Sequence, residues 1–158
     1  MGKRGLDGHK KKVQPYILLA QEDKQVNMRT ITLKLLELTL KGLPPTVNQM
    51  YRNAGTRVRY KTKKTRDYQR YAIKAMQEAH LVPYTFEGRT ILNVKFFVAE
   101  KRKWDIDNRL KALQDCLQMA GIIKDDSQID DIHAQREWLP SGNTQTCLTV
   151  FSILELPN

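Results

Sequence analysis

A strand pattern that passes directly into a helix pattern, over residues 91–120, constrains the fold of this chain more than any other feature. Four apolar residues alternate with other side chains and predict a half-buried strand over residues 91–99: Leu92, Val94, Phe96 and Val98. Four more recur at helical spacing and predict a helix over residues 108–120: Leu110, Leu113, Leu117 and Ala120. Asp107 is placed to cap this helix and Gly121 to end it.

The rest of the chain supplies further strands and one further helix. Residues 31–40 alternate and then shift register at Leu35, which predicts a strand with a bulge or two abutting strands. After Pro44 and Pro45 we expect a loop up to Lys64. Residues 132–138 and 146–156 predict two strands joined as a β-hairpin. A helix over residues 63–79 is predicted by one stripe: Tyr68, Tyr71, Ala72, Ala75, Met76 and Ala79.

This order of elements predicts a single α/β domain with a mixed β-sheet and helices packed on one face. At 158 residues the chain suits one domain, which we place at residues 28–158 after an N-terminal extension of residues 1–27. No apolar run reaches the roughly 20 residues of a membrane helix, and no secretory leader is evident. Cys116 and Cys147 form no disulfide framework, so we expect a cytoplasmic protein that does not enter a membrane.

The chain is strongly basic, with 27 Lys and Arg against 17 Asp and Glu. Such a balance favours a nucleic-acid partner through counterion release. Basic residues gather around Tyr51 and Tyr60 and again after the strand at residues 91–99, so tyrosines are placed to stack on bases. The DNA-binding candidates are Arg52, Arg57, Arg59, Lys61, Lys63, Lys64, Lys101, Arg102 and Lys103.

Acids crowd into the middle of this basic chain, since eight of the 17 lie between Glu100 and Asp131. Asp105 and Asp107 form a D-x-D unit that, if extended, points both carboxylates the same way. Lys111 follows one helical turn later, and the Asp125-Asp126 pair is placed to bring a third carboxylate back. Hard carboxylate ligands suit Mg²⁺, which activates water and neutralises a phosphate oxygen during phosphodiester hydrolysis.

Each of these acids also has an ordinary explanation. Asp107 alone is a helix cap, Asp107 with Lys111 is a surface ion pair, and Asp125 with Asp126 is a solvated turn. An EF-hand is excluded because Arg109 and Leu110 occupy positions where that loop needs an acid or Asn and then Gly. Zinc is disfavoured because the three histidines are scattered. The conjunction of the acids therefore favours a magnesium-dependent nuclease over isolated roles.

The sequence DIDNRLK at residues 105–111, followed by AGIIKDD at residues 120–126, resembles the RusA family of Holliday junction resolvases. LPPTVNQMYR, residues 43–52, resembles the family's Pro-Pro loop, so the likeness spans residues 28–156. It implies metal-binding catalytic carboxylates at Asp105, Asp107 and Asp126, with Lys111 as the catalytic lysine. It also implies a homodimer that uses Mg²⁺, or Mn²⁺ in its place, to resolve four-way DNA junctions by paired nicks in recombination and repair.

Two departures from the family pattern are visible. Residues 1–27 exceed it, and Gln114 stands where some relatives carry an aromatic residue. The resemblance further implies a bacterial or phage origin. Two alternatives stay open, a nuclease for flaps or forks and a non-catalytic basic DNA-binding protein. Four acids are assigned to supporting or solvated positions: Asp115, Asp125, Asp130 and Asp131.

Overall fold

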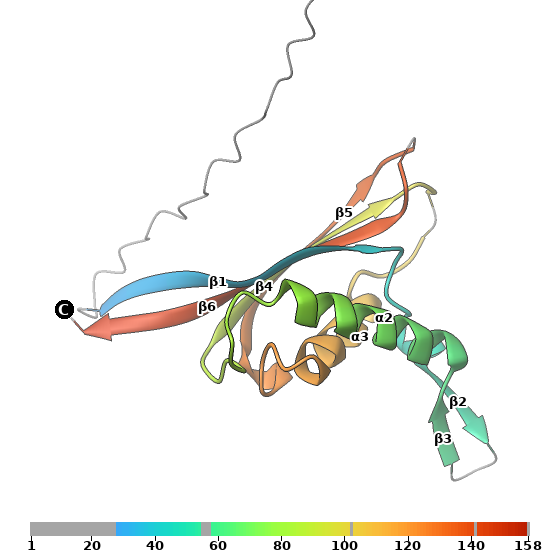
Figure 1. Cartoon of the computed structure of the whole chain (residues 1–158). Coiled ribbons are helices and arrows are strands. Elements are labelled where there is room, and N and C mark those ends of the chain that lie inside the picture. Colours follow the sequence, from blue (N-terminus) through green and yellow to red (C-terminus); the bar gives the residue numbers. More distant parts are fainter. Residues whose placement is uncertain (1–27, 55–57, 102, 141, 158) are drawn as a thin grey trace, which may run out of the picture.

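A computed structural model describes residues 28–54, 58–101, 103–140 and 142–157 (Figure 1). The predicted extension at residues 1–27 and the candidates Arg57 and Arg102 lie outside the described residues. A mixed sheet is formed by β1 (Met28–Lys41), β4 (Thr90–Val98), β5 (Ile129–Trp138) and β6 (Gln145–Pro157). Its order is β1-β6-β4-β5, with β4 and β5 parallel and the other neighbours antiparallel.

Two long helices, α2 (Lys63–Ala79) and α3 (Asp107–Met119), cover one face of this sheet and contact each other (Figure 1). The predicted mixed sheet with helices on one face is confirmed. The strand prediction for residues 91–99 is also confirmed, since β4 is buried at alternate positions from Thr90 to Val98. The core residues of β4 meet Leu113 and Leu117 of α3 and Met76 of α2.

β1 is one strand with a bulge, which is the first of the two arrangements that the shifted alternation predicted. Its pairing with β6 slips between Lys34 and Leu36, and Leu35 and Leu36 are both buried. An extra residue in one strand reverses which side chains point to a given face. The bulge therefore keeps the apolar side chains before and after it on the same side of the sheet.

The predicted hairpin between the last two strands is wrong. Both strands exist, but β4 lies between β5 and β6 and pairs with each of them. β4 and β5 are parallel, which is the arrangement that a crossover through α3 produces. Turn residues at 140–143 show only that the chain reverses, not which strand lies next in the sheet.

The loop predicted after Pro45 is wrong for residues 47–54 and 58–61, which form a helix and two strands. A short helix α1 (Val47–Met50) leads into a hairpin of β2 (Tyr51–Ala54) and β3 (Val58–Lys61). This hairpin projects away from the main sheet beyond the start of α2 (Figure 1). The protrusion carries several of the predicted DNA-binding residues away from the body of the domain.

α2 has the predicted bounds, and Thr62 caps it by accepting a hydrogen bond from the backbone of Thr65. Part of its predicted stripe is wrong, because Tyr71 is exposed and its hydroxyl accepts a hydrogen bond from the Lys41 backbone at 2.9 Å. Tyr68 packs against the core as expected. Burial raises the pKa of the Tyr68 hydroxyl well above its ordinary value.

Gly121 ends α3 in a left-handed conformation with φ of 75°. The backbone N–H of Gly121 donates to Gln118 and that of Ile122 donates to Leu117, which is the Schellman arrangement. We expect Gly121→Ala to lower the free energy of unfolding by about 1 kcal/mol, because an alanine is strained at this φ. Urea denaturation measures this, and an unchanged midpoint would contradict it.

None of the helices among the described residues is both long enough and apolar enough to cross a membrane.

Candidate active site at the start of helix α3

Trp104 anchors the segment that leads into the acidic motif. Its ring meets Phe96 of β4 edge-on at 5.5 Å and is partly buried against the core. Two guanidinium groups also lie against this ring, Arg109 at 4.7 Å and Arg136 at 5.0 Å. Each is a cation–π contact. Trp104 therefore packs against the core and helps to fix the position of Asp105, which comes directly after it.

Asp105 and Asp107 do not form the extended unit that the sequence suggested. Ile106 between them has helical dihedrals, φ −63° and ψ −44°, and α3 begins at Asp107. Ile106 is therefore the N-cap, and the prediction that Asp107 caps the helix is wrong. In helical geometry, residues two apart do not face each other. Both carboxylates are exposed, and that of Asp105 accepts a hydrogen bond from Asn108 at 3.2 Å.

Lys111 contacts two of the acids in this region. It lies four residues after Asp107 and three after Asn108, so all three share one side of α3. Its ammonium contacts Asp115 of the same helix at 3.2 Å and donates a hydrogen bond to Asp126 after the helix. The hydrogen bond to Asp126 raises the pKa of Lys111, so this side chain stays charged at neutral pH.

The loop after α3 holds Asp126 beside Lys111. Asp126 begins a short 3₁₀ helix, η1 (Asp126–Gln128), for which Asp125 is the N-cap. The Asp125 side chain accepts a hydrogen bond from Ser127, which lowers its pKa. Gln128 fastens the loop by accepting from Lys124 and Asp125 and donating to the carbonyls of residues 86 and 88. Asp125 thus has a structural role, and Asp126 faces the site.

The structure brings together Lys111 and Asp115 of α3 with Asp126 of η1, while Asp107 is exposed at the start of α3 and Asp105 is exposed just before it. Within the described ranges, no three His, Cys, Asp or Glu side chains form a ready-made metal site. The donor chemistry still fits a hard divalent cation, because carboxylate oxygens of Asp115 and Asp126 already flank one cationic atom. Asp115, which sequence reasoning placed in a supporting role, is the least exposed acid of this group at 19%.

The described DNA-binding candidates fall into two groups. One follows the β2–β3 hairpin and the start of α2, where Arg59 lies over the Tyr51 ring at 4.9 Å and Tyr60 is 45% exposed. A shallow cavity there is lined by Arg52, Tyr60, Thr62, Lys63, Lys64 and Arg66. Lys61 differs from the others, since its ammonium donates to Gln69 at 3.1 Å.

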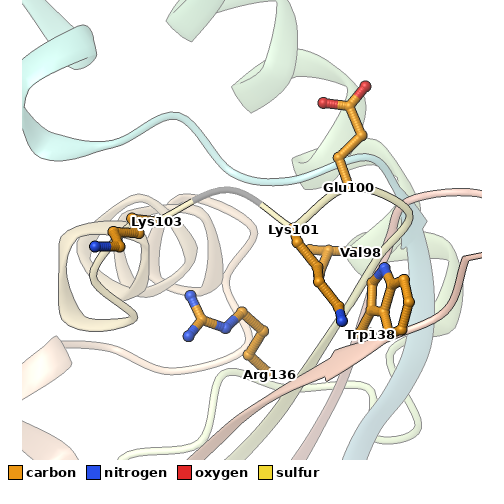
Figure 2. Close-up of a pocket in the computed structure, with 6 residues that line it drawn as sticks. All are labelled: Val98, Glu100, Lys101, Lys103, Arg136 and Trp138. Carbon is orange, nitrogen blue, oxygen red and sulfur yellow. The ribbon is translucent and has the colours of Figure 1, made fainter.

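The second group surrounds a cavity where β4 and β5 end (Figure 2). Lys101 and Lys103 were predicted from the sequence. Arg136 and Trp138 were not, because they lie on β5 and reach the cavity only through its pairing with β4. A prediction that β4 and β5 are parallel neighbours would have identified both residues, because this register places Trp138 opposite Val98.

Comparison with known proteins matches this sequence to one family. A family model described as Endodeoxyribonuclease RusA matches residues 42–149. A crossover junction endodeoxyribonuclease RusA of Aquifex aeolicus (strain VF5) is 32% identical over 108 residues, covering 65% of this chain and 80% of the relative. A crossover junction endodeoxyribonuclease rusA of Enterobacteria phage HK97 is 33% identical over 93 residues, covering 59% of this chain and 76% of the relative. The chain belongs to the RusA family of endodeoxyribonucleases.

Proposed function

We propose that this protein resolves four-way DNA junctions by paired nicks and that it needs Mg²⁺, or Mn²⁺ in its place, to do so. The observation that carries the proposal is the convergence of Asp115 and Asp126 on Lys111, beside the exposed Asp105 and Asp107. The two relatives are named as crossover junction endodeoxyribonucleases, which supports the same substrate here.

In this proposal Asp105, Asp107 and Asp126 hold the metal, and Asp115 lies beside them. When bound, the metal supplies a Lewis acid that polarises the phosphate and lowers the pKa of water. Lys111 then has two tasks, since its charge offsets the carboxylates in the free protein and can meet the scissile phosphate in the complex. Asn108 orients Asp105 through their hydrogen bond.

The rest of the surface supplies electrostatic attraction. The chain carries a formal net charge of +10, and exposed cations line both cavities, one at the β2–β3 hairpin and one where β4 and β5 end. Phosphate contacts from Lys and Arg position a duplex without reading its sequence. Such contacts suit an enzyme that recognises the shape of a branched substrate.

A comparison of substrates tests this function. We expect end-labelled four-way junctions to be cut much faster than flaps, forks or linear duplex of the same sequence. Preference for flaps or forks would instead indicate the alternative nuclease. Junction binding without cleavage in Mg²⁺ or Mn²⁺ would indicate a non-catalytic DNA-binding protein.

We also propose that the protein acts as a homodimer, because paired nicks in a symmetric junction need two active sites. An apolar surface supports this proposal. β1 and β6 run beyond the helices (Figure 1). The strand pairing places three large exposed side chains of this extension on the helix side of the sheet: Ile31 42%, Leu33 52% and Leu156 42%. A second copy is the occupant that we propose for this arm, because an apolar strip on two strands invites pairing.

A double variant tests the dimer. Ile31→Thr with Leu33→Thr keeps β-favouring residues but removes apolar area, so we expect light scattering to shift from dimer toward monomer. Leu81→Thr is the matched control, because Leu81 is 60% exposed elsewhere. A wild-type monomer that still makes paired nicks would contradict the dimer.

A further inference from the structure

A cavity of about 390 Å³ lies beside the candidate active site, at the ends of β4 and β5 (Figure 2). It is lined by Val98, Glu100, Lys101, Lys103, Arg136 and Trp138. Three of these six side chains are cations, and one is a large aromatic ring. In Figure 2 the Glu100 carboxylate points away from Lys101 and Trp138, while Arg136 lies between Lys101 and Lys103. The cavity is therefore cationic with an aromatic wall.

Trp138 forms that wall, and its side chain is fixed by a hydrogen bond but stays accessible to solvent. It is 48% exposed, and its indole nitrogen donates to the carbonyl of Ala99 at 3.3 Å. The Lys101 ammonium lies over its ring at 3.6 Å. A cation on an exposed indole marks a face that the protein's own core does not cover. An anionic ligand can draw the ammonium away and leave that face to a planar group.

Arg136 links this cavity to the active site. Its guanidinium donates to the carbonyl of Trp104 at 3.1 Å and lies over the Trp104 ring. Trp104 directly precedes Asp105. A phosphate bound by Lys101 and Arg136 would therefore lie next to the segment that leads into the carboxylates.

We propose that this cavity binds one unstacked nucleotide of the DNA strand next to the incision, with its phosphate on Lys101 and Arg136 and its base on Trp138. The inference rests on the proposed function, because bases in continuous duplex are already stacked and only a branch point offers a free one. Lys103 adds a further cation at the cavity mouth. Base stacking on an aromatic side chain tolerates any sequence.

The test measures junction binding by fluorescence anisotropy in EDTA. We expect Trp138→Ala to weaken binding of a four-way junction by roughly 5- to 100-fold, as loss of one stacked base predicts, while Trp138→Phe keeps most of the affinity. Lys101→Gln should also weaken binding. The matched controls are Tyr84→Ala, an exposed aromatic residue at 58%, and Lys95→Gln, whose ammonium lies 5.7 Å from the Phe97 ring.

A series of junctions with one abasic site at successive positions beside the branch completes the test. When the abasic site is at one of these positions, we expect wild type to bind the junction as weakly as Trp138→Ala binds the intact junction. The same abasic site should not weaken binding by Trp138→Ala any further. Linear duplex should show no effect of Trp138→Ala, which also excludes misfolding. The inference is overturned if no abasic position removes the effect, or if Trp138→Ala binds junctions like wild type. In either case junction cleavage by wild type would leave the proposed function intact, whereas wild type that neither prefers nor cuts junctions would contradict that function itself.

Discussion

Asp107→Asn is expected to reduce junction cleavage by about 10³-fold or more while leaving junction binding intact or tighter. Asparagine keeps the shape of the side chain but removes the charge that a divalent cation requires. Binding is expected to hold or improve because one fewer carboxylate repels the phosphates. Cleavage of an end-labelled junction in Mg²⁺ and a gel shift in EDTA measure the two effects.

Asp67→Asn is the matched control for this prediction. Asp67 is an exposed acid on α2 that lies 3.7 Å from Arg70, so its replacement removes the same charge from a surface position outside the acidic motif. We expect this control to cut junctions at the wild-type rate. Full cleavage by Asp107→Asn in Mg²⁺ would contradict the role assigned to Asp107.

Lys111→Met is the second change with a large expected effect. Cleavage should fall by about 10²- to 10³-fold, because the variant loses a positive charge aimed at the phosphate. Mn²⁺ should bind the protein alone more tightly, because Asp115 and Asp126 lose the ammonium that contacts both of them. Calorimetric titration with Mn²⁺ measures this without any activity readout.

Lys74→Met provides the control for the lysine. Lys74 pairs with Glu78 at 3.8 Å with the same i, i+4 spacing, and both side chains are exposed on α2. We expect its removal to change neither Mn²⁺ affinity nor cleavage. Weaker Mn²⁺ binding in Lys111→Met would show that this lysine does not compete with the cation.

Local patterns predicted most of the secondary structure. The alternation in β4 and the stripes in α2 and α3 depend on which side chains face the core, and a periodic pattern reports that directly. The order of strands depends on pairing between distant segments, so the insertion of β6 between β1 and β4 was not visible. The β2–β3 hairpin was missed because its four-residue strands are too short and polar for a periodic signal.

In the candidate site too, the spacing along the helix was predicted correctly, whereas the contacts that depend on strand pairing were not. Helical spacing predicted that Lys111 lies one turn after Asp107, and in the structure Lys111 contacts Asp115 one further turn along the same helix. The helical conformation of Ile106 was not predicted, because the D-x-D unit reads equally well as the end of a strand. Trp138 and Arg136 escaped notice because only the parallel register of β4 and β5 brings them to Lys101.

The most direct test of the central claim is a cation titration of cleavage on a four-way junction labelled separately on two opposite strands. We predict no cleavage in EDTA and, as Mg²⁺ or Mn²⁺ is added, nicks at symmetric positions on both strands of the same junction. Cleavage that persists in EDTA, or nicks that are no faster in the junction than in linear duplex, would contradict a metal-dependent junction resolvase.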